Sequence, residues 1–279
     1  MPAASASAPN LPRHWLVPDW PAPARVRAVF TTRGASAVDG ASVPPYAHFN
    51  LGDHVGDAPA AVAANRVALQ AAIGARPVFL NQVHGTAVRL LAASTPDGVG
   101  ADAAATAEAG LACTVMVADC LPVLFTDRQG RAVAAAHAGW RGMAGGVLER
   151  TLECFAALAG AQPAQAAISI EAGEVLAWLG PCIGPQAFEV GPEVREAFLA
   201  ADAGAGACFV PTGQGGRLLA NLPALARRRL AAAGVTTVWG NDGSPAWCTV
   251  AQGQRYFSYR RDQAALGGTG RMAACIWRV

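Results

Sequence analysis

The 279-residue sequence contains no lysine, because all 21 of its basic residues are arginine. This absence excludes a catalytic lysine and the Schiff-base chemistry that depends on one. Charge is sparse as well: charged residues make up 14% of the chain and the formal net charge is +2. The longest basic run, Arg227 to Arg229, is typical of a solvated helix face. We therefore expect neither nucleic acid nor a membrane surface as a partner.

The sequence also lacks a Cys-x-x-Cys pair, and its seven cysteines are scattered. An odd number without paired spacing argues against a disulfide framework and favours a reducing, cytoplasmic location. No apolar run reaches membrane-spanning length, since the best candidate, 111–118, ends at Asp119. Residues 1–24 are rich in Ala, Pro and Ser and lack the charged start and apolar core of a signal peptide. We predict a partly disordered leader over 1–24 and a single catalytic domain over 25–279.

Apolar patterning predicts a mixture of helices and strands. Strands are expected at 25–32, 77–83, 111–118, 131–136, 235–239 and 272–277, and helices at 58–74, 143–159, 192–202 and 221–233. Residues 121–126 are expected to continue the 111–118 strand beyond a kink at Asp119 to Pro122. Neither a repeat nor an internal linker is visible, so one domain of mixed α and β structure is the simplest interpretation.

Three segments each place a His or a Cys where an apolar stretch gives way to a small-residue turn. They are His84 in Asn-Gln-Val-His-Gly, Cys120 in Ala-Asp-Cys-Leu-Pro and His137 in His-Ala-Gly-Trp-Arg-Gly. Three protein ligands and a vacant position are typical of a catalytic zinc site. The same residue types match the trigonal set of blue copper. A multicopper oxidase needs many further histidines, and this chain has five in all. Zn²⁺ is therefore preferred to Cu²⁺.

Asp119 directly precedes Cys120, and neighbouring side chains of an extended segment point to opposite faces. A kink near Pro122 would bring both toward the metal region. Asp119 could then orient a ligand histidine or act as a general base. A carboxylate that caps a turn at the strand end explains its position equally well.

Arginines in glycine-rich turns are candidate anion sites. Arg141 lies at a predicted helix start, where backbone N–H groups also favour an anion, and Arg66 lies within a predicted helix. Arg260 and Arg261 are further candidates for phosphate or carboxylate. A metal-free alternative uses Cys120 as nucleophile and His137 as base, as in a Cys–His hydrolase.

Eight motifs in order carry a resemblance to a known family. They are Thr-Thr-Arg-Gly at 31–34, Asn-Leu-Gly-Asp-His-Val-Gly-Asp at 50–57, Asn-Arg at 65–66, the three segments given above, Gly-Pro-Cys-Ile-Gly at 180–184 and Phe-Ser-Tyr-Arg-Arg-Asp at 257–262. From about residue 25 to the C-terminus, the chain resembles the YfiH/FAMIN-like family, whose members are labelled laccase-domain or polyphenol oxidase proteins. One departure is Asn221, which stands where many members carry an aspartate.

The resemblance implies an α+β domain with large mixed β-sheets flanked by helices, the YfiH-like or CNF-like fold, and zinc held by His84, Cys120 and His137. It implies purine nucleoside phosphorylase activity on adenosine, inosine and 5′-methylthioadenosine, with adenosine deaminase side activity. Purine nucleosides and phosphate would be the small-molecule partners. Cys120 and Asp119 would act in catalysis, with Arg66 and Arg141 on phosphate and a purine stacked on Trp140 or Phe257. The alternatives are a Cys–His amide hydrolase that edits cell-wall peptide precursors, a copper-dependent phenol oxidase and a nucleotide-binding protein without catalysis.

Overall fold

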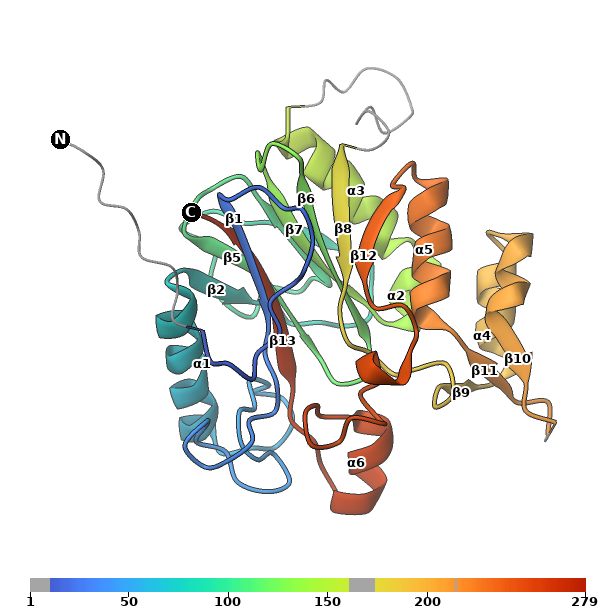
Figure 1. The fold of residues 1–279 in the computed structure, drawn as a ribbon, viewed down its shortest axis with the longest axis horizontal. Coiled ribbons are helices and arrows are strands. Elements are labelled where there is room, and N and C mark those ends of the chain that lie inside the picture. Colours follow the sequence, from blue (N-terminus) through green and yellow to red (C-terminus); the bar gives the residue numbers. More distant parts are fainter. Residues whose placement is uncertain (1–10, 161–173, 214) are drawn as a thin grey trace.

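Two β-sheets pack face to face, and helices cover the outer face of each (Figure 1). The computed structural model describes residues 11–160, 174–213 and 215–279. The four-stranded sheet has the order β1 (Val26–Phe30), β13 (Met272–Arg278), β5 (Leu111–Val117), β2 (Arg76–Phe79). The six-stranded sheet has the order β12 (Thr237–Gly240), β8 (Val175–Leu179), β6 (Leu121–Asp127), β7 (Val133–Ala138), β4 (Ala103–Thr106), β3 (Val88–Leu90).

Strand β5 shows why the central strands are mostly apolar on both faces. Its alternate residues Val115 and Val117 pack between the two sheets, with Leu124 and Ala135 of the other sheet. Met116, which points the opposite way, packs in a second cluster between the four-stranded sheet and helix α1. Because both faces are covered, nearly every position of the strand is apolar. Its one polar side chain, Thr114, donates a hydrogen bond to the carbonyl oxygen of Ala112 at 3.1 Å.

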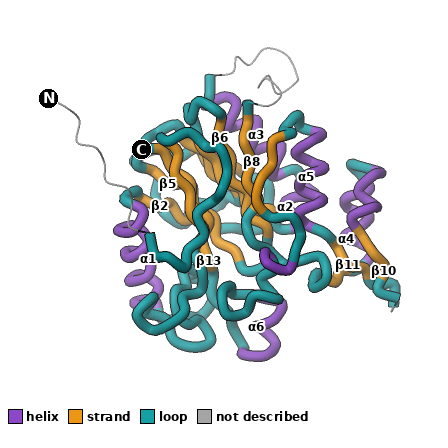
Figure 2. The backbone as a smooth tube through the Cα atoms, viewed as in Figure 1, coloured by secondary structure: helices purple, strands orange, loops and turns teal. Residues whose placement is uncertain are grey.

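Helix α1 (Pro59–Ile73) covers the four-stranded sheet, and α3 (Val147–Leu158) and α5 (Leu222–Ala232) cover the six-stranded sheet (Figure 2). A small third sheet lies beside α4 (Pro192–Leu199). Its strands are β9 (Glu189–Val190), β10 (Phe209–Pro211) and β11 (Leu218–Ala220). Two short helices flank the site described below, α2 (Trp140–Gly145) and α6 (Tyr259–Leu266). Short 3-10 turns complete the chain at Ala203–Cys208 and Pro245–Trp247.

The predicted α+β class with large mixed sheets is confirmed, while two predicted elements are wrong. Residues 121–126 do not continue the preceding strand, since β5 and β6 belong to different sheets. The chain changes direction at Asp119, whose φ of 92° lies in the left-handed region. The predicted helix 143–159 is divided into α2 and α3 at Gly146, where a φ of 100° interrupts the helical backbone.

Part of the predicted leader contacts the domain. Leu16 exchanges backbone hydrogen bonds with Phe30, and buried Trp15 packs against Phe49. Residues 1–10 lie outside the described residues. Across the ranges that the structure describes, no helix is both long enough and apolar enough to cross a membrane.

Candidate active site

His84, Cys120 and His137 come together from three separate segments. His84 lies in the loop after β2, Cys120 lies in the turn between β5 and β6, and His137 lies in β7. In the pairing of β6 with β7, Pro122 is opposite His137, so that Cys120 reaches the same sheet edge. The three potential ligand atoms lie within 4.8 Å of one another, and Cys120 Sγ is 3.7 Å from His84 Nε2.

Gly139 leaves room for this ligand cluster. A Cβ atom at this position would lie 2.9 Å from His84 Cδ2 and 3.0 Å from Cys120 Sγ. Gly142 is equally constrained, because a Cβ there would lie 2.7 Å from the carbonyl oxygen of Gly85. The glycines of the His-Ala-Gly-Trp-Arg-Gly segment thus permit the close approach of α2 to the His84 loop.

The buried Asp102 carboxylate fixes two of the three ligands. Its Oδ1 accepts a hydrogen bond from His84 N at 2.9 Å and contacts His137 Nδ1 at 2.8 Å. Its Oδ2 accepts hydrogen bonds from the backbone N–H groups of Gly85 at 2.7 Å and Val83 at 3.2 Å. The contact with Nδ1 leaves His137 Nε2 available toward the cluster, which is the usual arrangement of a carboxylate behind a metal-binding histidine.

The electrostatics of the cluster favour a thiolate. Burial opposes ionisation of Cys120, but the His137 and His84 imidazoles outweigh it and lower the pKa of the thiol to about 6. Burial likewise opposes protonation of His137, while Cys120 and Asp102 raise the pKa of that imidazole to about 9. A thiolate and two imidazoles form a donor set suited to a borderline-soft transition metal.

A cavity of about 270 Å³ opens beside the cluster. It is lined by His54, Gln82, His84, Met116, Val117, Ala118, Asp119, Cys120, His137, Ile183, Phe188, Tyr259, Arg260 and Arg271. Gln82 is fixed by two hydrogen bonds to the backbone of Met116, at 2.8 Å from its Nε2 and 2.7 Å to its Oε1. The cavity volume of about 270 Å³ lies just below the range of about 300–1,000 Å³ typical of small-molecule sites.

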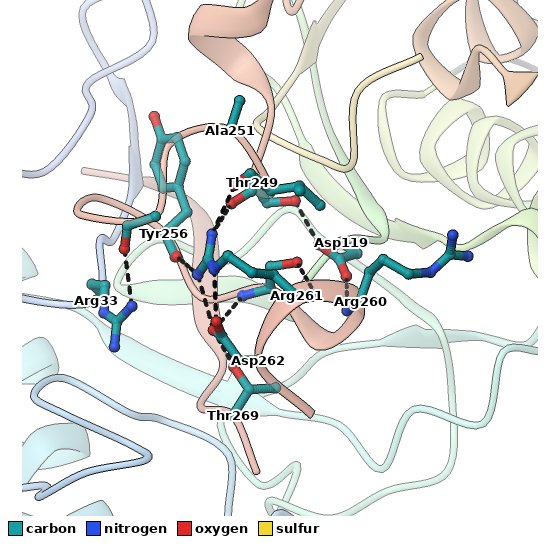
Figure 3. A network of polar contacts seen from close by, with 12 residues as sticks. Arg33, Asp119, Thr249, Ala251, Tyr256, Arg260, Arg261, Asp262 and Thr269 are labelled. Atoms are coloured by element: carbon teal, nitrogen blue, oxygen red, sulfur yellow. Dashed lines mark hydrogen bonds and ion pairs between the residues drawn. The ribbon is translucent and has the colours of Figure 1, made fainter. Parts of the chain in front are cut away.

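Asp119 lines the cavity but contacts neither histidine ligand. Its Oδ1 accepts a 2.5 Å hydrogen bond from the Thr249 hydroxyl, and its Oδ2 accepts one at 2.7 Å from the backbone N–H of Arg260 (Figure 3). The residue that orients His137 is instead Asp102. The sequence analysis does not include Asp102, although a single carboxylate among the alanines at 101–105 is a signal that points to it.

The two arginines predicted to bind phosphate lie outside the cavity lining. Arg66 donates from Nε to the carbonyl oxygen of Leu51 at 3.0 Å and is paired with Asp53 at 3.2 Å. Arg141 is exposed and lies over the Trp140 ring. The guanidinium groups that do line the cavity belong to Arg260 and Arg271. Arg261, the third arginine of the region, is used internally and binds Asp262 and backbone carbonyl groups (Figure 3).

The aromatic residues of the cavity also differ from those expected. Phe257 is fully buried beneath the guanidinium of Arg33, and Trp140 is covered by Arg141. Phe188 and Tyr259 line the cavity instead. Phe188 lies in the loop before β9, and Tyr259 is the first residue of α6, within the 257–262 motif. The motif alone does not show that Tyr259 lines the cavity while Phe257 is buried.

Among the described residues, His84, Cys120 and His137 form the one group of three potential ligands close enough to share an ion. All five histidines of the sequence lie within the described ranges. Their distribution does not provide the additional histidines that a coupled copper cluster requires.

Relatives of the chain extend over nearly its whole length. A protein of Pseudomonas aeruginosa named a purine nucleoside phosphorylase is 48% identical over 263 residues, covering 94% of this chain and 98% of the relative. A purine nucleoside phosphorylase YfiH of Escherichia coli is 47% identical over 266 residues, covering 95% and 98%.

Two solved structures share the fold. Protein NMB0706 of Neisseria meningitidis superposes with a TM-score of 0.81 at 45% identity, covering 95% of this chain and 99% of that one. The hypothetical protein YfiH of Bacillus licheniformis gives 0.78 at 26% identity, covering 91% and 93%. A family model described as multi-copper polyphenol oxidoreductase laccase matches residues 27–279. The chain therefore belongs to this laccase-like family of YfiH proteins.

Proposed function

We propose that this chain is a zinc-dependent purine nucleoside phosphorylase with residues 25–279 as its catalytic domain. Its substrates would be adenosine, inosine and 5′-methylthioadenosine, with adenosine deamination as a side activity. The observation that carries the proposal is the His84–Cys120–His137 cluster, which lines a cavity of about 270 Å³. Relatives named purine nucleoside phosphorylases, close to half identical over nearly their full length, support the reaction class.

His84, Cys120 and His137 are the residues that would hold the metal, and their donor atoms suit zinc. When bound, zinc would supply a Lewis acid that polarises a substrate oxygen and balances the charge of the Cys120 thiolate. Asp102 orients His137 from behind and so acts as a positioning residue.

The pocket residues supply binding and proton transfer. Phe188 and Tyr259 offer aromatic surface for a purine, and the Asp119 carboxylate is available to accept a hydrogen bond or a proton from the nucleoside. In phosphorolysis a phosphate oxygen forms a bond to C1′ while the bond from C1′ to the purine nitrogen breaks. The electron pair leaves with the purine, which then takes up a proton.

The test is to incubate the purified, metal-analysed protein with adenosine, with and without phosphate, and to separate the products. We expect adenine and ribose 1-phosphate only when phosphate is present, and loss of both in Cys120→Ala. Cys154→Ala is the matched control, because Cys154 lies on α3 away from the cavity. Inosine formed regardless of phosphate would make deamination the main reaction. If neither phosphorolysis products nor inosine form, the proposal is contradicted.

A Cys–His amide hydrolase is the second candidate, favoured by the low pKa of Cys120 beside two imidazoles. It predicts that the protein as purified cleaves muropeptide precursors and that alkylation of Cys120 abolishes this activity. If bound zinc protects the Cys120 thiol from alkylation and no peptide is cleaved, the hydrolase candidate is eliminated.

A further inference from the structure

The cavity contains a guanidinium that its own protein neighbours do not fully use. Arg271 is half-buried, and its Nη1 donates to the carbonyl oxygens of Thr269 and Gly270, each at 3.1 Å. Within the described part of the chain, its Nε and Nη2 have no hydrogen-bond acceptor. Two adjacent N–H donors at one edge of a fixed guanidinium match two oxygens of a carboxylate or phosphate.

The loop 50–54 is built around this arginine. Buried Asn50 accepts the backbone N–H of Arg271 at 2.8 Å and that of Gly52 at 2.9 Å. A Cβ at Gly52 would lie 2.7 Å from Arg271 Cγ, so the loop backbone packs directly on the arginine side chain. The Asn-Leu-Gly-Asp-His motif contains none of the three potential metal ligands. It fixes Arg271 instead and brings His54 into the same cavity.

The other arginines near the cavity are committed to protein partners. Arg260 donates to the carbonyl oxygens of Ala187 and Glu189 at 3.4 and 3.0 Å. Arg66 braces loop 50–54 through Leu51 and Asp53. His54 lies beside Asp53, with 3.5 Å between Nδ1 and Oδ1. Partial desolvation and the nearby positive charge of Arg271 lower the pKa of His54, which favours a neutral ring able to accept a hydrogen bond from a ligand.

We propose that Arg271 and His54 form the phosphate subsite of this pocket, with Arg66 as a positioning residue for the loop that holds them. The proposal rests on the proposed phosphorylase function and assigns its second substrate to named residues. Arg271 would bind two phosphate oxygens, and His54 would accept the hydrogen of the monoprotonated anion. The phosphate would then lie in the same cavity as Asp119 and Cys120.

The charges around Arg271 define the competing explanation. Burial lowers the pKa of Arg271, and the negative charges of Cys120 and Asp119 oppose that effect. An arginine that only balances these two charges would not contact phosphate. In that case replacement of Arg271 would change nucleoside turnover without a selective rise in the KM for phosphate.

The experiment compares Arg271→Gln, His54→Gln and the rival site Arg141→Gln, with Arg89→Gln on the exposed edge strand β3 as the matched control. The KM values for phosphate and for adenosine are measured separately with the zinc-loaded enzyme. Loss of a charge-assisted hydrogen bond predicts a rise of about tenfold or more in the KM for phosphate with Arg271→Gln. The KM for adenosine should change by less than about twofold, and Arg271→Lys should recover part of the loss.

A second readout does not depend on turnover. The Tm of each variant is measured in phosphate and in chloride at equal ionic strength, without nucleoside. Phosphate should raise the Tm of the wild-type protein and of Arg89→Gln, and this rise should vanish in Arg271→Gln. A phosphate-dependent Tm together with no phosphorolysis would reject the proposed function and retain the anion site.

Two outcomes would overturn the subsite. One is an Arg271→Gln protein that keeps the wild-type phosphate KM and the wild-type Tm shift. The other is a raised KM for phosphate together with a lost phosphate-dependent Tm shift in Arg141→Gln but not in Arg271→Gln. If Arg271→Gln does not fold, His54→Gln decides the question, since the His54 side chain is 55% exposed and tolerates replacement.

Discussion

At the scale of single residues, the Asp102 carboxylate joins the His84 loop to His137. It receives three backbone N–H groups of the His84 loop and faces the His137 ring, while being fully buried. The hydrogen bonds from His137 and Gly85 lower the pKa of Asp102 against the opposing effect of burial. Asp102 is therefore held as a carboxylate, the form that can satisfy all four contacts.

Replacing Asp102 by Asn tests this role. The amide keeps the shape but offers one acceptor oxygen and turns an NH₂ group toward N–H donors. We expect zinc affinity to fall about 10–100-fold, as is usual when the partner of a ligand histidine is lost. Competition with a chromophoric chelator measures the affinity, and Asp19→Asn, at an exposed position, is the control. Equal zinc affinity in both variants would show that Asp102 does not orient the ligands.

Cys120 should have an unusual pH dependence in the metal-free protein. Its pKa is lowered from 9.0 to about 6, so the thiolate predominates at pH 7 and is lost as the pH falls through 6. Alkylation by iodoacetamide should therefore have a midpoint near pH 6, while Cys154, whose pKa is raised, should react slowly at pH 7. Mass spectrometry of the labelled peptides gives both rates. Zinc should protect Cys120, and a midpoint above pH 8 in the metal-free protein would contradict the described electrostatics.

The sequence predicts the three ligand candidates because each is a reactive residue type at a strand end. It does not identify Asp102, Arg271 or His54, whose importance depends on contacts between distant segments. For Arg66 the sequence motif predicts a phosphate contact, whereas in the structure its guanidinium contacts Leu51 and Asp53. Residue type suggests chemistry, whereas the direction of a side chain is set by tertiary packing.

At the scale of elements, the start of α2 is constrained by the ligand cluster. Gly139 is the N-cap of that helix, and a methyl group there would meet His84 and Cys120 at about 3 Å. We expect Gly139→Ala to abolish zinc binding and to cost about 1–3 kcal/mol of stability through overpacking. Zinc content and urea denaturation measure the two effects. Gly100→Ala, where a Cβ meets nothing within 4 Å, should retain full zinc occupancy. Retained zinc in Gly139→Ala would contradict the described packing.

Asn221 has a structural role at the start of α5. Its side chain accepts the backbone N–H of Ala224 at 3.0 Å and caps α5. Asn221→Ala should lower the free energy of unfolding by about 1 kcal/mol, and Asn221→Asp should restore it, because both Asn and Asp cap helices well. Activity should not change, since residue 221 does not line the cavity. Loss of activity at unchanged stability would contradict this assignment.

The predictable elements are those with a strong apolar pattern, such as α1 and the mostly apolar β5. Strand β4 was missed because its run of alanines also suits a helix, and its strand conformation depends on pairing with β7. The separation of β5 from β6 could not be predicted either. It depends on the left-handed backbone of Asp119. The side-chain carboxylate of this residue accepts hydrogen bonds from Thr249 and Arg260 of the distant C-terminal region.

At the scale of the whole molecule, the packing of two sheets brings the site together. β5 of one sheet leads directly into β6 of the other, so the turn between them carries Asp119 and Cys120 to the edge where both sheets end. The loop after β2 brings His84 from the four-stranded sheet, and β7 brings His137 from the six-stranded sheet. The proposed metal site thus joins the two sheets, and removal of a bound ion should destabilise the whole domain.

The most direct test of the central claim is a titration of metal-free protein with zinc while adenosine phosphorolysis is followed. We expect activity to be absent without metal, to rise in proportion to added zinc and to level off at one equivalent per chain. The Tm should rise over the same range, because zinc binds the folded state. Full phosphorolysis in the metal-free protein, or activity that appears only with copper, would contradict the account.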